Sequence, residues 1–530
     1  MEDEKLKKEI LKKSTGDQWN KIGIRNHHGI CFPLFSLHSE NSCGIGEFFD
    51  LIPMIKWCRR MGMNIIQLLP LNDTGLSTSP YNAISANALS PIHITLSALF
   101  QIERVPDYQQ KLAKIRYWNY TDRVKYYIVR ELKFAFFREY VPLVYQDYSQ
   151  STDYQLFLQQ NPWIQPYALF NSLKEEQLWT HWEEWPIYLK NPSENEYKEL
   201  CKKYEKKCQF YTFLQYISYK QLKKVKQIAT QNNILLKGDI PILISRDSVD
   251  VWHFRRYFFM NQVAGAPPDM QSREGQYWGF PTYNWKEIEK DGYQWWEERL
   301  QTASYFYHLY RIDHVVGFFR IWSIPVGQPA KAGAFFPVNK EEWMSQGVKL
   351  IKMLIQKGKM FPIAEDLGVV PLEIKNSLHD LGLCGTKMMR WERYWESEGS
   401  FIPINQYQPT TMTTVSNHDS DPLQLWWRHF PKEAKLFCQF KQWGYKPFLT
   451  LHQHKEILWD SHHSSSLLHI NPLQEYLALF PQLISENPNN ERINIPGTIL
   501  STNWTYRFRL PIEKITENIP LAETIHNLIK

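Results

Sequence analysis

Three carboxylates stand directly after short apolar runs of the sequence. They are Asp313, Glu365 and Asp419. The carboxyl ends of parallel barrel strands meet at one rim, and barrel enzymes carry out their chemistry there. Two carboxylates on such a rim suit a retaining glycosidic mechanism, because one attacks the anomeric carbon while the other protonates the leaving oxygen. We predict that these three residues are catalytic, although rim placement by itself leaves other chemistries open.

Each of these residues also has an ordinary structural interpretation. A single carboxylate at a strand end is usually a helix cap or an ion-pair partner, and Arg311 beside Asp313 fits a simple salt bridge. The functional interpretation rests on three such strand ends in order, two of them with a neighbouring histidine, His314 and His418.

The histidines raise the alternative of a metal site, since two histidines and a carboxylate can bind iron or zinc. However, His314 and His418 each directly neighbour a carboxylate, and adjacent residues of a strand point to opposite faces. The zinc-protease spacing H-E-x-x-H is also absent. We therefore predict no metal and no other cofactor.

The elements that position these carboxylates are short apolar runs alternating with helical patterns. Such alternation favours a parallel sheet, and eight candidate strands predict an α/β fold of the (β/α)8 barrel class. The candidate strands are 29–34, 64–71, 234–244, 307–313, 361–366, 387–390, 412–417 and 498–504. Helical patterns between them include 48–61, 295–309, 341–357 and 371–381.

Uneven spacing of the strands predicts two insertions. Residues of about 72–230 have helical periodicity and many Lys, Glu, Tyr and Trp, and we expect a helical insertion there. Residues of about 245–290 are rich in Pro, Gly and aromatics, which indicates a structured loop over the barrel mouth. We expect residues 29–530 to form one catalytic body, preceded by a charged tail at 1–28.

Composition excludes several classes of protein. The 530 residues carry a net charge of only +6, so a nucleic-acid partner is not expected. No apolar stretch is long enough for a membrane span, and the charged N-terminus does not resemble a secretory signal. The seven scattered cysteines form no C-x-x-C pair, which favours a reducing, cytoplasmic location. Aromatics reach 15%, which suits carbohydrate stacking but also a large core.

An ordered set of motifs resembles the 4-α-glucanotransferases (amylomaltases, disproportionating enzymes) of glycoside hydrolase family 77. The resemblance runs from about residue 29 to 509. The motifs are Ser79-Pro80-Tyr81, Lys237-Gly238-Asp239-Ile240-Pro241, Asp247-Ser248-Val249-Asp250, Gly275-Gln276-Tyr277-Trp278-Gly279, Arg311-Ile312-Asp313-His314, Glu365-Asp366-Leu367-Gly368, His418-Asp419, Asn494-Ile495-Pro496-Gly497 and Asn503-Trp504.

The resemblance implies a role for each matching residue. Asp313 is the expected nucleophile, Glu365 the general acid and base, and Asp419 the carboxylate that grips the donor sugar. The expected substrate-binding residues are Ser79, Tyr81, Asp239, Gln276, Trp278, Arg311, His314, His418 and Asn494. The implied reaction is retaining transfer of α-1,4-glucan segments between malto-oligosaccharides or glycogen-like glucans.

Departures from the common pattern leave the acceptor open. Met270-Gln271 stands where many amylomaltases carry Tyr-Phe, and residues 71–74 and 278–285 look closer to the plant cytosolic disproportionating branch. That branch passes glucose from maltose to a polysaccharide. An α-glucan hydrolase and a catalytically silent glycan-binding protein are the remaining alternatives, and the oligomeric state is not predicted.

Overall fold

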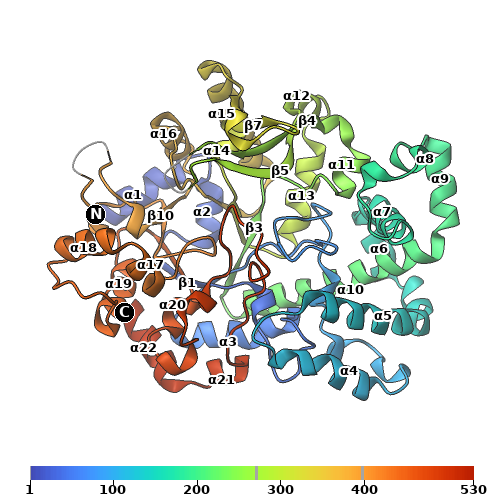
Figure 1. The fold of residues 1–530 in the computed structure, drawn as a ribbon, viewed down its shortest axis with the longest axis horizontal. Helices are drawn as coiled ribbons and strands as arrows, with labels where there is room; N and C mark the ends of the chain where they lie inside the picture. Colours follow the sequence, from blue (N-terminus) through green and yellow to red (C-terminus); the bar gives the residue numbers. More distant parts are fainter. Residues whose placement is uncertain (1, 269–271, 396–398) are drawn as a thin grey trace.

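A closed barrel of eight parallel strands forms the centre of the molecule. The computed structural model describes residues 2–268, 272–395 and 399–530 (Figure 1). The sheet has the order β10-β11-β12-β1-β2-β3-β6-β9, and a parallel bridge between Ile363 and Cys384 joins its two ends. The strands are β1 (His27–Cys31), β2 (Ile65–Gln67), β3 (Leu235–Ile240), β6 (Leu309–Ile312), β9 (Phe361–Ala364), β10 (Gly385–Met388), β11 (Thr411–Thr414) and β12 (Leu468–Pro472).

The predicted fold class is confirmed, and so are most of the predicted strands. The sixth strand, expected at 387–390, lies slightly earlier as β10. The eighth, expected at 498–504, is wrong: that stretch is a turn in which Ile499 is fully exposed, and the true eighth strand is β12. The sequence of β12 does not look like a buried strand, because it contains the polar residues His469 and Asn471. Both are nevertheless buried, and both are hydrogen-bonded to Ser461.

Helices cover the outside of the barrel. Amphipathic patterns explain them, since each buries an apolar face against the strands or against neighbouring helices. They include α3 (Leu51–Met61), α10 (Glu205–Gln231), α13 (Gln294–Ser304), α15 (Lys340–Lys357), α16 (Leu372–Asp380), α17 (Leu423–His429), α18 (Pro431–Phe440), α19 (Leu451–His462), α20 (Leu473–Leu477), α21 (Ile512–Thr516) and α22 (Ile519–Ile529), with the short α14 (Val316–Phe319) after β6.

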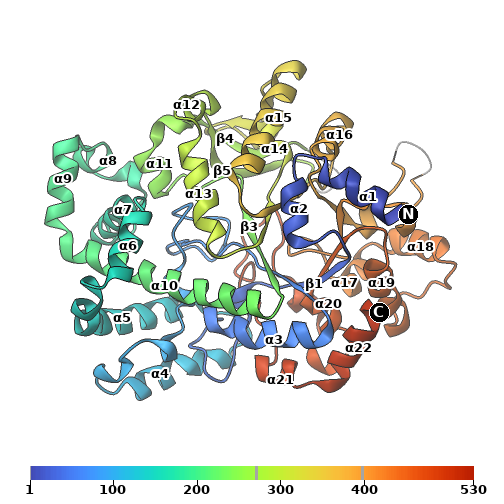
Figure 2. The ribbon, with the colours of Figure 1, turned by 180° about the vertical axis from the view of Figure 1, so that it is seen from behind.

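The long segment between β2 and β3 builds a lobe on one side of the barrel (Figures 1 and 2). It begins with an irregular stretch to about residue 107 rather than with helix. The helices that follow are α4 (Tyr108–Arg116), α5 (Tyr126–Ser149), α6 (Thr152–Gln160), α7 (Ile164–Glu176), α8 (Ile187–Lys190) and α9 (Glu194–Lys203), which lead into α10.

The segment expected as an aromatic loop at 245–290 is largely regular. After α11 (Val249–His253) it forms the antiparallel pair β4 (Phe258–Ala266) and β5 (Gln276–Tyr283), and α12 (Trp285–Lys290) follows. With β7 (Ile321–Pro325) and β8 (Ala334–Phe336) these strands make a four-stranded sheet, β5-β4-β7-β8. The Pro and Gly content suggested a loop, whereas β4 and β5 pair in an antiparallel ladder with two register shifts.

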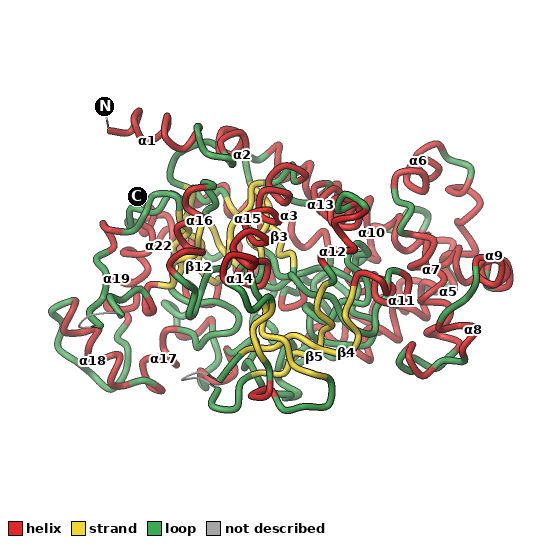
Figure 3. The backbone as a smooth tube through the Cα atoms, turned by 90° about the horizontal axis from the view of Figure 1, so that it is seen from above, coloured by secondary structure: helices red, strands yellow, loops and turns green. Residues whose placement is uncertain are grey.

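The N-terminal residues expected as a charged tail are instead helices α1 (Glu2–Leu11) and α2 (Gly16–Ile22). Trp19 of α2 is completely buried, and its ring meets the ring of Phe361 edge-on at 4.5 Å. It belongs to a buried apolar cluster with Ile10 and Leu309 at the end of the barrel where the strands begin. Figure 3 shows α1 and α2 at one end of the barrel and β4 and β5 at the other. The N-terminus therefore closes the end of the barrel opposite the predicted catalytic rim.

None of the described helices is long and apolar enough to cross a membrane. The seven cysteines are all unpaired.

Replacing Trp19 with alanine should destabilise the whole barrel. The substitution leaves a cavity under β6 and β9, and such large-to-small changes cost about 3–5 kcal/mol. Urea unfolding followed by tryptophan fluorescence and circular dichroism would measure the change in the free energy of unfolding.

Trp395→Ala is the matched control, because the Trp395 side chain is 59% exposed and should change stability by less than about 0.5 kcal/mol. Equal effects of the two substitutions would show that the N-terminal helices do not support the barrel.

Candidate active site

Asp313 and Glu365 are brought together by strand register. Strands β6 and β9 are neighbours in the barrel, and Ile312 of β6 pairs with Ala364 of β9. The next residue on each strand is a carboxylate, so Asp313 and Glu365 stand at the same level on adjacent strands. Adjacent strands lie about 4.8 Å apart. This spacing is close to the carboxylate separation of about 5–5.5 Å that retaining glycosidases use.

A single guanidinium, that of Arg311, lies among three acidic side chains. Its Nη1 is 2.7 Å from Asp313 Oδ1 and 3.0 Å from both carboxylate oxygens of Asp239, while its Nη2 is 3.7 Å from Glu365 Oε2. Asp239 pairs in register with Arg311 across β3 and β6, which explains their contact. Burial raises the pKa of Asp239, and Arg311 opposes that rise. Arg311 thus fixes the relative positions of the acidic groups.

Glu365 has the electrostatic properties of a general acid. Burial raises its pKa to about 7, an effect that Arg311 opposes and the negative charge of Asp313 reinforces. Its carboxylate accepts hydrogen bonds from the backbone N–H of His314 at 2.9 Å and of Leu367 at 3.3 Å. A carboxyl group with a pKa near neutrality can donate a proton and take it back.

Asp419 lies beyond the end of β11, which is separated from β9 and Glu365 by one strand, β10. Asn494 Nδ2 donates to its Oδ1 at 2.6 Å, and His418 Nε2 lies 3.2 Å from its Oδ2. Burial alone would raise the pKa of Asp419, but His418 and Asn494 together lower it to about 2. Asp419 is therefore an anion at neutral pH, in contrast to Glu365.

Tyr81 connects the two sides of the rim. Its hydroxyl donates to Asp239 Oδ2 at 2.7 Å and lies 3.0 Å from His418 Nε2. Its ring stacks on the ring of His418, with centroids 5.4 Å apart. The result is one continuous polar network from Arg311 through Asp239, Tyr81 and His418 to Asp419.

Trp278 and Gln276 approach the site from β5. The Trp278 indole meets the His314 ring edge-on at 5.0 Å and donates to Gln276 Oε1 at 3.1 Å. His314 has a left-handed backbone with φ of 46°, a strained conformation for a non-glycine residue and one that is common at functional sites. Burial lowers its pKa. Strand β5 thus places the Trp278 indole against His314, the residue that follows Asp313.

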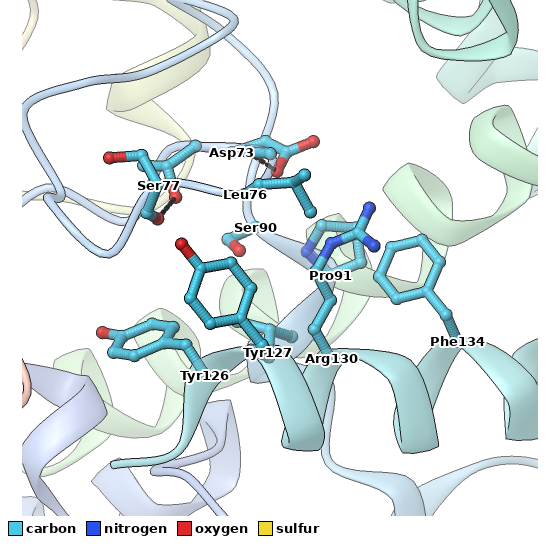
Figure 4. A pocket seen from close by; sticks show the side chains of 12 residues that line it. Asp73, Leu76, Ser77, Ser90, Pro91, Tyr126, Tyr127, Arg130 and Phe134 are labelled. Carbon is cyan, nitrogen blue, oxygen red and sulfur yellow. Dashed lines mark hydrogen bonds between the residues drawn. The ribbon is translucent and has the colours of Figure 1, made fainter. Parts of the chain in front are cut away.

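Ser79 lies in the same loop as Tyr81, and its backbone N–H donates to Ser77 Oγ. No hydrogen bond from its side chain to the three carboxylates is seen among the described residues. Figure 4 shows a pocket near the start of this loop, between Asp73–Ser77 and the first turns of α5. Its volume of about 20 Å³ has room for a water molecule but not for a glucose unit.

The prediction that His418 and Asp419 point to opposite faces of a strand is wrong. Strand β11 ends at Thr414, so His418 and Asp419 lie in the turn beyond it and both face the site. Within the described residues no group of three or more His, Cys, Asp or Glu side chains is arranged to hold a metal ion. Met270 and Gln271, the predicted departure from the family pattern, lie outside the described residues.

Two further residues support the site and are not among the predicted site residues. The Trp504 ring packs 5.5 Å from Tyr81 and 5.8 Å from His418. Arg492 donates to the backbone oxygen of Asp419 at 3.3 Å and pairs with Asp421. Trp504 belongs to a motif visible in the sequence, whereas nothing in the spacing of Arg492 marks it.

Fold and site together define a barrel enzyme with the paired carboxylates of retaining glycoside chemistry. The family model described as 4-alpha-glucanotransferase matches residues 32–512. The chain belongs to this family, glycoside hydrolase family 77, and is an enzyme that transfers α-1,4-glucan segments.

Individual relatives agree with this assignment. A 4-alpha-glucanotransferase of Chlamydia muridarum is 44% identical over 96% of both chains. The solved amylomaltase of Streptococcus agalactiae, in complex with acarbose, has the same fold, with a TM-score of 0.83 at 24% identity over 95% of this chain and 98% of that one. The alternative of the plant-like branch is not favoured, because the rice 4-alpha-glucanotransferase DPE2 matches 60% of this chain and 35% of its own length, at 34% identity.

The value of kcat/KM should fall as the pH rises through about 7. A general acid must carry a proton to release the leaving group, and the raised pKa of Glu365 places the loss of its proton near neutrality. Glu365→Gln should lose about 10²–10⁴-fold in activity on maltotriose. It should keep the first step with α-maltosyl fluoride, since fluoride leaves without a proton. Steady-state and burst kinetics between pH 5 and 9 would measure both.

The stability of the same variant provides an independent control. A carboxyl whose folded pKa exceeds its unfolded value of about 4.5 begins to destabilise the fold above pH 4.5, and does so fully above pH 7. Glu365→Gln should therefore be more stable than the wild type at pH 8, by up to about 3 kcal/mol, and not at pH 4. An alkaline limit that is unchanged in Glu365→Gln would contradict the assignment.

Proposed function

We propose that Asp313 is the nucleophile and Glu365 the acid and base of the transfer reaction. The observation that supports this most strongly is the register of β6 and β9, which sets the two carboxylates side by side on adjacent strands. In the first step Glu365 gives its proton to the glycosidic oxygen, and the bond from that oxygen to C1 breaks. The carboxylate of Asp313 bonds to C1, which leaves the donor chain attached to the enzyme with inverted configuration.

In the second step the 4-hydroxyl of an acceptor glucan gives its proton to the carboxylate of Glu365. Its oxygen attacks C1 and displaces Asp313, so two inversions give net retention. Arg311 stabilises Asp313 when it leaves as an anion. The permanently ionised Asp419 is suited to binding hydroxyl groups of the donor sugar, with His418, Tyr81 and Asn494 around it.

We propose that malto-oligosaccharides are donors and that glycogen-like glucans serve as acceptors. Trp278 and Gln276 extend the site on the side of β5, where a flat indole can cover the apolar face of a sugar. Ser79 and His314 are proposed to donate to sugar hydroxyls. The barrel and both insertions are taken to act as one catalytic body, and the seven unpaired cysteines fit a reducing cytoplasm.

Maltotriose as the sole substrate should give glucose and a ladder of longer chains with a constant number of reducing ends. Transfer conserves glycosidic bonds, so chromatography of the products and a reducing-end assay distinguish it from hydrolysis. Asp313→Asn should lower the rate by at least about 10³-fold, because it removes the group that accepts C1.

Asp122→Asn is the matched control on the exposed surface and should transfer at the wild-type rate. A rise in the number of reducing ends without longer chains would show that the enzyme hydrolyses maltotriose instead of transferring segments of it. Full transfer by Asp313→Asn would overturn the assignment of the nucleophile.

A further inference from the structure

The loop that carries Tyr81 has little regular structure of its own. Residues 74–83 are turns and bends between Asp73 and Ile84, which pair through the Ile84 N–H and the Asp73 carbonyl at 2.8 Å. Because the Tyr81 hydroxyl must meet Asp239 and His418, something outside the loop has to hold it in one conformation.

Buried contacts from the helical insertion hold the loop at Asp73. The Asp73 carboxylate is buried and accepts hydrogen bonds from the Tyr167 hydroxyl at 2.6 Å and from the Gly75 N–H at 3.1 Å. Tyr167 belongs to α7 and is completely buried. Figure 4 shows Asp73 at the head of the loop, which then passes Leu76 and Ser77 above α5.

A second helix of the insertion completes this anchor. Gln215 of α10 donates to the Tyr167 oxygen at 3.0 Å. The same amide pairs with the backbone of Leu89, accepting from its N–H at 2.9 Å and donating to its carbonyl at 2.8 Å. Gln215 therefore fixes the return strand of the loop and orients the Tyr167 hydroxyl toward Asp73.

The Tyr167 hydroxyl has a defined direction because of these partners. A buried carboxylate without a donor is costly, so the hydroxyl hydrogen points to Asp73, while Gln215 occupies an acceptor position on the oxygen. Among the described residues the Tyr167 hydroxyl bonds to Asp73 and Gln215 and to none of the residues proposed to bind substrate. Its influence on the reaction must pass through the loop.

We infer that Tyr167 is a positioning residue for the transfer reaction: through Asp73 it sets the place of Tyr81 between Asp239 and His418. The helical insertion is then part of the catalytic apparatus, because it supplies the fixed side of a loop whose other end reaches the barrel rim. This inference rests on the substrate-binding role proposed for Tyr81.

The experiment compares kcat and KM for maltotriose in five full-length variants: Tyr167→Phe, Tyr81→Phe, the double variant of these two, Asp73→Asn, and Tyr140→Phe. Tyr140 is the matched control, since it is completely buried in α5 of the same insertion and its hydroxyl donates to the Phe100 carbonyl at 2.8 Å. Thermal unfolding of every variant shows that each is folded at the assay temperature.

Tyr167→Phe should lower kcat/KM by about 10-fold, since it removes a buried hydrogen bond on which a reacting geometry depends. Tyr140→Phe should stay within about twofold of the wild type even if its unfolding temperature falls by the same amount. In the double variant the loss should equal that of Tyr81→Phe alone, because both substitutions disable one contact. Asp73→Asn keeps an oxygen acceptor for Tyr167 and should lose less than Tyr167→Phe.

Losses that multiply in the double variant would overturn the inference and leave the role of Tyr81 intact. A Tyr167→Phe enzyme as active as Tyr140→Phe would overturn it as well. If Tyr81→Phe alone transfers normally, the proposed role of Tyr81 fails and the inference fails with it.

Discussion

The site depends on one buried cation, the guanidinium of Arg311, placed among Asp239, Asp313 and Glu365. A single positive charge cannot balance three negative charges in a poorly solvated rim, so some of these groups must hold protons at neutral pH. Burial raises the pKa of Asp239 and of Glu365, the latter to about 7. Burial and the charge of Asp313 outweigh the opposing effect of Arg311 on Glu365, so Asp313 has beside it a carboxyl group that can hold a proton near neutral pH. This is the combination that the proposed bond cleavage needs.

The rest of the fold keeps this arrangement in register. Parallel pairing of β3, β6 and β9 sets Asp239 level with Arg311, and Asp313 level with Glu365. Trp19 packs on Phe361 of β9 at the end of the barrel opposite the rim, so the strands cannot shift without opening a cavity. At the rim, β5 of the four-stranded sheet contributes Trp278, and a loop held by the helical insertion contributes Tyr81.

Much of this could be predicted from the sequence, and the failures have physical causes. Asp313 and Glu365 follow strongly apolar strands, so their position at strand ends is visible in the residues themselves. Strand β12 was not predicted, because the buried polar residues His469 and Asn471 interrupt its apolar pattern. A strand was predicted at 498–504 instead, because apolar residues such as Ile499 occur there, although Ile499 is exposed. Trp19 was hidden by the charges of α1. The bridge from Tyr81 to Asp239 and His418 joins three distant segments, and such contacts arise only when the barrel closes.

The most direct measurement is the titration of the Glu365 carboxyl group in the folded enzyme. Infrared difference spectra of the wild type against Glu365→Gln, recorded from pH 4 to 9, isolate the carbonyl band of this one protonated acid. Because burial raises the pKa of Glu365 to about 7, this band should disappear with a midpoint near pH 7. A midpoint near the ordinary value of about 4.5 would show that burial and the charge of Asp313 do not keep Glu365 protonated against the effect of Arg311, and would contradict the mechanism.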